Sequence, residues 1–72
     1  MEIKKAQFEN EDSRLPTVLT IKTDYNTYVY FDSYRTIGTE VLLKRGGISV
    51  GKILLGQKGL KQFRTDFEQA RT

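Results

Sequence analysis

The side chains of this chain that could do chemistry are aromatic and basic. Its four tyrosines all lie within the ten residues "YNTYVYFDSY", at Tyr25, Tyr28, Tyr30 and Tyr34. The cations we expect to act with them are Lys22, Lys44, Arg45 and Lys52. Aromatic rings stack on unpaired bases, and lysine or arginine neutralises the phosphates between them. A surface that joins the two residue types would bind single-stranded nucleic acid.

Strand alternation decides which tyrosines share a face. Successive strand residues point to opposite sides, so Tyr28 and Tyr30 lie opposite Val29 and Phe31. If Val29 and Phe31 face the core, the two tyrosines face outward beside Lys22 of the preceding strand. Three interpretations of this tyrosine pair stay open: packing within the sheet, stacking on bases, or a protein interface.

Catalytic chemistry is not expected. The chain has no cysteine and no histidine, which removes thiol chemistry, the usual zinc sites and the commonest general base. Its acids are scattered over predicted loops and exposed positions, so we predict no catalytic residue, no metal site, no cofactor and no small-molecule substrate.

One stretch has the letters of a phosphate-binding loop. "GGISVGK" (46–52) fits G-x-x-x-x-G-K, but Ile53 follows where such loops carry serine or threonine. A chain of 72 residues is also too short for the α/β sheet that holds them. We interpret Gly46 and Gly47 as a tight turn between two strands, because glycine adopts positive φ angles freely.

Length and charge limit the possible partners. We expect one domain over residues 1–72, with a core small enough to favour a homodimer. Residues 1–36 carry five cations and six acids, for a net charge of −1, whereas residues 37–72 carry seven and three, for +4. Such an excess suits a polyanion or an acidic protein. No apolar run approaches a bilayer's width and the first residues are unlike a signal peptide, so we predict a cytoplasmic protein without membrane contact.

The hydrophobic pattern predicts five strands and a helix. We expect an edge strand within 2–9, a hairpin over 17–32, and further strands at 39–45 and 48–55. Gly51 interrupts the last strand and indicates a bulge, a bend or a close approach of another backbone. From Gln57 the period becomes helical, with an apolar stripe of Leu60, Phe63, Phe67 and Ala70. The predicted fold is α+β: one curved antiparallel sheet of four or five strands, with the C-terminal helix packed on one face.

The segment "KILLGQKGLKQFRTDFEQA" resembles the last strand and helix of the single-stranded-DNA-binding domains of the Whirly, Pur-alpha and transcriptional positive-cofactor type. Lys52 precedes the short apolar strand, and large apolar residues recur along the helix that follows. "KRGGIS" (44–49) also resembles the entry to that strand in the coactivator members, in an alternative alignment. The resemblance implies a curved four-stranded sheet, dimerisation through the helices and sequence-tolerant binding of single strands on the sheet. This chain departs from the pattern at Leu60, where those families commonly carry tryptophan.

These observations lead to one functional hypothesis and one alternative. The hypothesis is a small, non-enzymatic domain that binds single-stranded DNA or RNA in preference to duplex, as a transcription-regulation or replication accessory factor. Its binding residues would be Lys22, Tyr28, Tyr30, Lys44, Arg45 and Lys52. The alternative is a protein-interaction module or inhibitor, of phage or plasmid type, that docks on an acidic partner protein.

Overall fold

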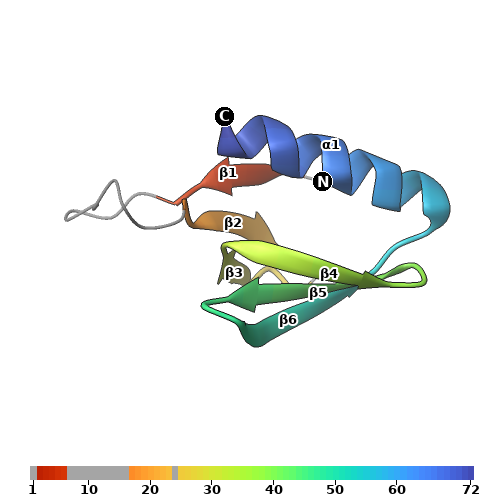
Figure 1. Cartoon of the computed structure of the whole chain (residues 1–72), viewed down its shortest axis with the longest axis horizontal. Helices are drawn as coiled ribbons and strands as arrows, with labels where there is room; N and C mark the ends of the chain where they lie inside the picture. The colour runs from red at the N-terminus through yellow and green to blue at the C-terminus, as the bar shows by residue number, and fades with distance from the viewer. Residues whose placement is uncertain (1, 7–16, 24) are drawn as a thin grey trace.

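The computed structural model describes residues 2–6, 17–23 and 25–72 of the chain (Figure 1). The described residues form six strands and one helix: β1 (Ile3–Lys5), β2 (Leu19–Lys22), β3 (Tyr28–Phe31), β4 (Ser33–Ile37), β5 (Glu40–Arg45), β6 (Ile48–Leu54) and α1 (Gln57–Arg71). The predicted α+β class with a C-terminal helix is confirmed. The prediction of one curved sheet was wrong: the strands form two antiparallel sheets, in the orders β1-β2-β3 and β4-β5-β6.

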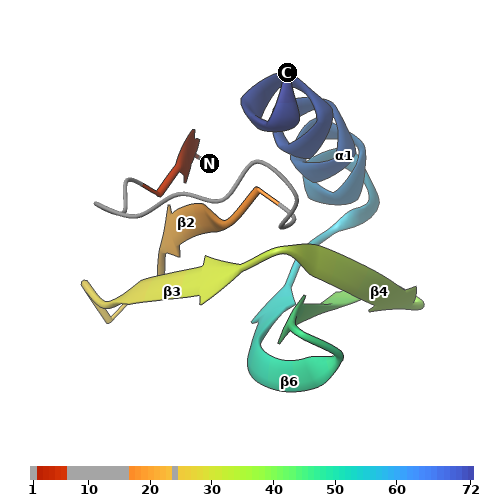
Figure 2. The same cartoon turned by 60° about the vertical axis from the view of Figure 1, so that its left-hand side comes forward.

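The two sheets are joined at a corner in a nearly continuous strand. Only Asp32 separates β3 from β4. Its N–H donates over 2.9 Å to the carbonyl of Lys44, which is a residue of the second sheet. Phe31 and Tyr34 both pack on the helix although they are three positions apart. Strict alternation would send them to opposite faces, so the pleat breaks once between them. A strand that bends in this way passes from one sheet to the other, as Figure 2 shows.

The first sheet contains the predicted hairpin. In its register Leu19 pairs with Phe31 and Ile21 with Val29, and the turn places Asn26 at a φ of 62°. The predicted edge strand is present as β1, which pairs with β2 alone among the described strands. Residues 7–9 of that prediction lie outside the described residues. The Lys5 ammonium donates to the Thr72 carbonyl over 3.1 Å, which ties β1 to the last turn of α1, where a cation is electrostatically favoured.

The second sheet contains the predicted glycine turn. Gly46 and Gly47 have φ angles of 60° and 81°, which confirms the expected conformation between β5 and β6. The Gly46 N–H donates to Asp32 Oδ2 over 2.8 Å. The residue at the corner between the sheets therefore also holds this turn.

At Gly51 the second sheet lies against the first. The β5–β6 register shifts between Leu43 and Lys44, so that Leu43 faces Gly51 whereas Lys44 faces Ser49. A Cβ on Gly51 would lie 3.4 Å from Val29 Cγ1 of β3. Of the alternatives expected at Gly51, the bulge is confirmed by this register shift, whereas the group that lies nearest is the side chain of Val29 and not another backbone.

Both sheets and the helix share one core. Its buried members are Leu19, Ile21, Phe31, Val41, Leu43, Phe63 and Phe67. The helical stripe is confirmed, because Phe63 and Phe67 are buried while Leu60 and Ala70 are partly buried against this cluster. Tyr34, which the sequence leaves at a strand end, packs edge-on against both helical rings, with centroid distances of 4.9 and 4.8 Å.

We expect two substitutions at Gly51 to differ in stability. Gly51→Ala places its Cβ at ordinary contact distances and should change the free energy of unfolding by less than about 1 kcal/mol. Gly51→Val pushes methyl groups into Val29 and should destabilise by about 1–3 kcal/mol. Urea unfolding followed by circular dichroism measures both. Equal stability of the two variants would contradict the proposed close approach.

Asp32 offers a test of the corner. Asp32→Ala removes the acceptor of the Gly46 N–H and should lower the free energy of unfolding by about 0.5–1.5 kcal/mol. Asp32→Asn keeps an acceptor oxygen and should lose less. Thermal unfolding of the two variants beside the parent chain gives the comparison. A larger loss for Asp32→Asn than for Asp32→Ala would show that this hydrogen bond does not support the turn.

Candidate nucleic-acid interface

The outward side of the first sheet carries the predicted tyrosine pair. Phe31 is fully buried and Val29 packs partly buried against the core, so the condition under which Tyr28 and Tyr30 face outward is met. Tyr28 and Tyr30 alternate with them and are 59% and 44% exposed. The register adds three neighbours to the same side, which we call the tyrosine face: Lys4, Thr20, Lys22, Tyr28 and Tyr30.

Lys22 is the predicted cation that the structure brings to this face. It pairs with Tyr28 across β2 and β3, and its Nζ lies 5.9 Å from the centroid of the Tyr28 ring. A cation at this distance is attracted by the ring's electron-rich face. One tyrosine therefore already presents a ring together with a positive charge.

Lys4 is a second cation on the tyrosine face, and sequence reasoning missed it. It faces Thr20 across β1 and β2, and its Nζ forms an ion pair with Glu2 Oε1 at 3.0 Å. The hydrogen bond to Glu2, and then the attraction between the two charges, raise the pKa of Lys4 above its ordinary value. The alternation of Ile3 with Lys4 was a signal for its orientation, but only the β1–β2 pairing brings it beside the tyrosines.

The spacing of Tyr28 and Tyr30 along β3 leaves room for a separate ligand group on each ring. They lie two positions apart in one strand, so their backbones are separated by about 6.6 Å. Tyr25, in the turn before β3, is 91% exposed. The tyrosine face and the turn beside it thus carry three solvent-exposed tyrosines.

The other predicted cations lie on the second sheet. Lys44 and Lys52 alternate with the buried Val41, Leu43 and their partners, so they point outward from β5 and β6. Lys52 pairs with Glu40 at 3.2 Å, and Arg45 faces Ile48 next to the glycine turn. Because the inner sides of the two sheets meet at Val29 and Gly51, their outward sides lie on different sides of the core. The structure does not place Lys44 and Lys52 on the tyrosine face.

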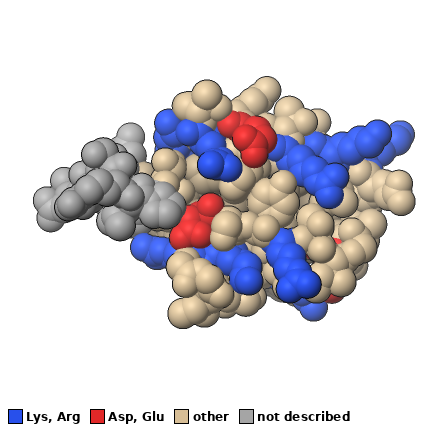
Figure 3. All heavy atoms as spheres, viewed as in Figure 1, with Lys and Arg blue, Asp and Glu red and all other residues tan. Residues whose placement is uncertain are grey.

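The remaining positive charge is spread over the surface. Four of the seven cations of the C-terminal half are exposed on α1: Lys58, Lys61, Arg64 and Arg71. Figure 3 shows lysine and arginine at several separate places on one side of the molecule. The excess counted along the sequence therefore does not correspond to one basic patch.

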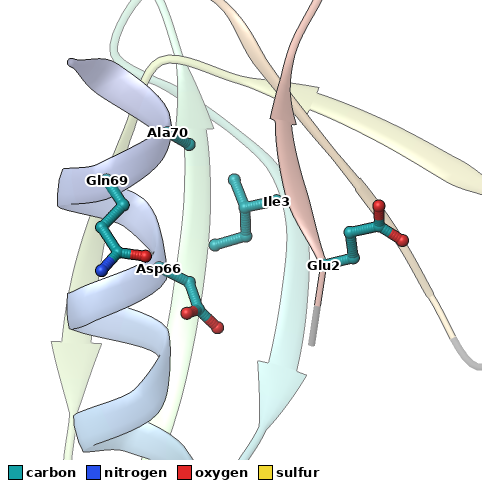
Figure 4. Close-up of a pocket in the computed structure, with 5 residues that line it drawn as sticks. All are labelled: Glu2, Ile3, Asp66, Gln69 and Ala70. Carbon is teal, nitrogen blue, oxygen red and sulfur yellow. The ribbon is translucent and has the colours of Figure 1, made fainter.

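A shallow pocket between β1 and α1 contains two carboxylates. Its lining residues are Glu2, Ile3, Asp66, Gln69 and Ala70. Figure 4 shows Ile3 pointing toward the helix and Glu2 pointing away from it. Asp66 Oδ1 accepts a hydrogen bond from Gln62 Nε2 over 2.8 Å. The two acids do not converge, so this pocket lacks the paired geometry of acid–base catalysis. Among the described residues, no group of three or more His, Cys, Asp or Glu is placed to hold a metal ion.

The pKa of Lys4 should change when its ion pair with Glu2 is broken. Since the pKa of Lys4 is raised, its contribution to stability is present below the unfolded-state pKa and is lost as pH rises through the folded-state value. Glu2→Gln removes the carboxylate and should lower the pKa of Lys4, as an NMR titration of the lysine side chain would measure. Glu68→Gln, which breaks the Arg71 pair instead, should leave Lys4 unchanged. If both variants changed the pKa of Lys4 equally, Glu2 would not be the cause of its raised value.

Comparison with known proteins finds no match to this chain. No family model, no curated protein and no solved structure matches the chain. In the part of the chain that the structure describes, no helix has the length and apolar character needed to cross a membrane. The functional interpretation therefore rests on the geometry of the tyrosine face.

Proposed function

We propose that this chain is a small, non-enzymatic nucleic-acid-binding domain that binds unpaired strands of DNA or RNA across the tyrosine face. One observation carries the proposal: Tyr28 and Tyr30 are exposed side by side, on the same side of the sheet as Lys22 and Lys4. Tyrosines that pack in a core would be buried. These two expose about half of their surface instead.

Binding would combine stacking with charge neutralisation. Two consecutive bases stack on Tyr28 and Tyr30, because the spacing of about 6.6 Å between alternate strand residues leaves room for one base on each ring. Lys22 moves from the Tyr28 ring to a phosphate, and Lys4 exchanges Glu2 for another. Both lysines are exposed, so these exchanges require no opening of the core.

The same geometry favours single strands over duplex. In a duplex the faces of the bases are covered by their neighbours, whereas rings that project from a strand need an uncovered base face. Stacking does not read hydrogen-bonding edges, so the domain should tolerate many sequences. Lys44, Arg45 and Lys52 act in this proposal through the long-range field that attracts a polyanion, because the tyrosine face is on another side of the core.

This activity suits an accessory factor in transcription regulation or replication. A homodimer in the cytoplasm belongs to the same proposal. In such a dimer two tyrosine faces would bind one strand together, and linked sites bind more tightly than either alone.

Removal of the rings should weaken binding. Stacking contributes about 1–3 kcal/mol per base, so Tyr28→Ala or Tyr30→Ala should each weaken binding of a fluorescent oligonucleotide by roughly 5- to 150-fold. Tyr28→Phe and Tyr30→Phe keep the ring and should bind nearly as the parent does. Fluorescence anisotropy at low salt measures all four. If the phenylalanine variants lose as much affinity as the alanine variants, stacking is not the mechanism.

The salt dependence provides an independent check in the same assay. Two phosphates neutralised on a single strand give a slope of log K against log salt of about −1.4, and Lys22→Ala should reduce its magnitude by about 0.7. Lys58→Ala, on the exposed side of α1, is the matched control and should leave the slope unchanged. Binding that does not respond to salt, or no binding at low salt, would exclude the proposed function.

A further inference from the structure

The outward side of the second sheet has a chemistry different from that of the tyrosine face. Val41 and Leu43 are fully buried, so Leu42 between them points outward from β5. On the neighbouring strands Ile37 and Leu54 face each other across Glu40, and they are 52% and 75% exposed. We call this surface the aliphatic face; it consists of Ile37, Leu42 and Leu54 with the surrounding Arg35, Glu40, Lys44 and Lys52.

Exposed aliphatic residues are ordinary when they occur singly. Here two exposed residues, Ile37 and Leu54, and the partly exposed Leu42 lie on three adjacent strands of one sheet, on the side that α1 does not cover. Charged residues alternate with them across the strands, and apolar side chains set among charged ones suit a site that binds another protein. No ring lies in the described register of this face, so it has nothing on which a base could stack.

The charges identify the kind of partner. Arg35, Lys44 and Lys52 share the face with one acid, Glu40, and that acid is already paired with Lys52 at 3.2 Å. The net charge is therefore about +2, and a second copy of the same face would meet it with equal positive charge. Like charges across an interface oppose association, whereas an acidic surface complements this one.

The spacing indicates the shape of the partner. Ile37 and Leu54 lie about 9.6 Å apart with Glu40 between them, and Leu42 lies about 6.8 Å from Glu40 along the central strand, so the three aliphatic residues form a triangle. A helix with its side chains is about 10–12 Å wide. One amphipathic helix that lies across the strands is therefore wide enough to contact Ile37, Leu54 and Leu42 together.

We infer that the aliphatic face is a docking site for an acidic amphipathic helix of another protein, separate from the tyrosine face. The helix places its apolar stripe on Ile37, Leu42 and Leu54. Acidic residues beside the stripe reach Arg35 and Lys52, which flank Leu42 on its two neighbouring strands. Because the two outward faces lie on different sides of the core, one domain can hold a nucleic-acid strand and a protein helix together.

A titration with a defined peptide tests the inference. The probe is a synthetic helix-forming peptide of about 15 residues, with leucines at helical spacing on one side and glutamates beside them. Added to the isotope-labelled full chain, it should shift the amide signals of Ile37, Leu42 and Leu54 saturably and leave those of Tyr28 and Tyr30 in place. A peptide with lysine in place of each glutamate should bind at least about tenfold more weakly, a factor that corresponds to 1.4 kcal/mol.

Matched variants locate the site and separate it from the proposed function. Leu54→Glu should weaken peptide binding by at least about tenfold, whereas Gln69→Glu adds the same charge on α1 and should not. Both substituted positions are exposed, so the fold is retained, and oligonucleotide affinity should stay within about twofold of the parent.

Four results would overturn the inference: no saturable shift, shifts centred on the tyrosine face, equal binding of the lysine peptide, or displacement of the peptide by the oligonucleotide. Sedimentation velocity tests the other possible occupant of this face, a second copy of the chain. Self-association that Leu54→Glu abolishes would assign this face to a second copy of the chain instead.

Discussion

The structure depends on one cluster of four aromatic rings at the corner between the sheets. Phe31 is the last residue of β3 and Tyr34 is the second residue of β4, yet both contact the same two residues of α1, Phe63 and Phe67, with ring centroids 4.8–6.3 Å apart. Edge-on and offset ring pairs stabilise beyond the area that they bury. The helix therefore packs on the junction of the sheets rather than on one sheet alone. Through this contact one helix covers inner residues of both sheets.

The corner also explains why the molecule has two different outward faces. Each sheet buries its inner residues against the other sheet and α1, so each keeps one side open to solvent. On the first sheet that side carries Tyr28 and Tyr30, whereas on the second it carries Ile37 and Leu54. A single curved sheet covered by a helix would have only one such side. The split into two sheets is thus the structural reason for considering two ligands of different chemistry.

The sequence predicted what depends on local pattern and missed what depends on the corner. Alternation identified the orientation of the β2–β3 hairpin, and the helical period identified Phe63 and Phe67, because both signals lie within a few residues. The strand β4 was missed because Asp32 interrupts the alternation and Arg35 and Thr36 weaken the apolar pattern. The positions of Lys4 and Lys52 relative to the tyrosines depend on strand pairing and on the crossing of the sheets, which no local pattern contains.

The charged side chains lie on the surface, so the residues available for binding differ from those that stabilise the fold. In the described part of the chain the buried side chains are all apolar, and the cations lie on strand exteriors or on the open side of α1. An exposed ion pair such as Lys4 with Glu2 contributes little to stability, so its lysine is free to exchange partners. Tyr28 and Tyr30 likewise lie on the exposed side of the strand, whereas their neighbours Val29 and Phe31 pack in the core. Ligand recognition and core packing therefore alternate along one strand, and each is altered by substitutions that leave the other in place.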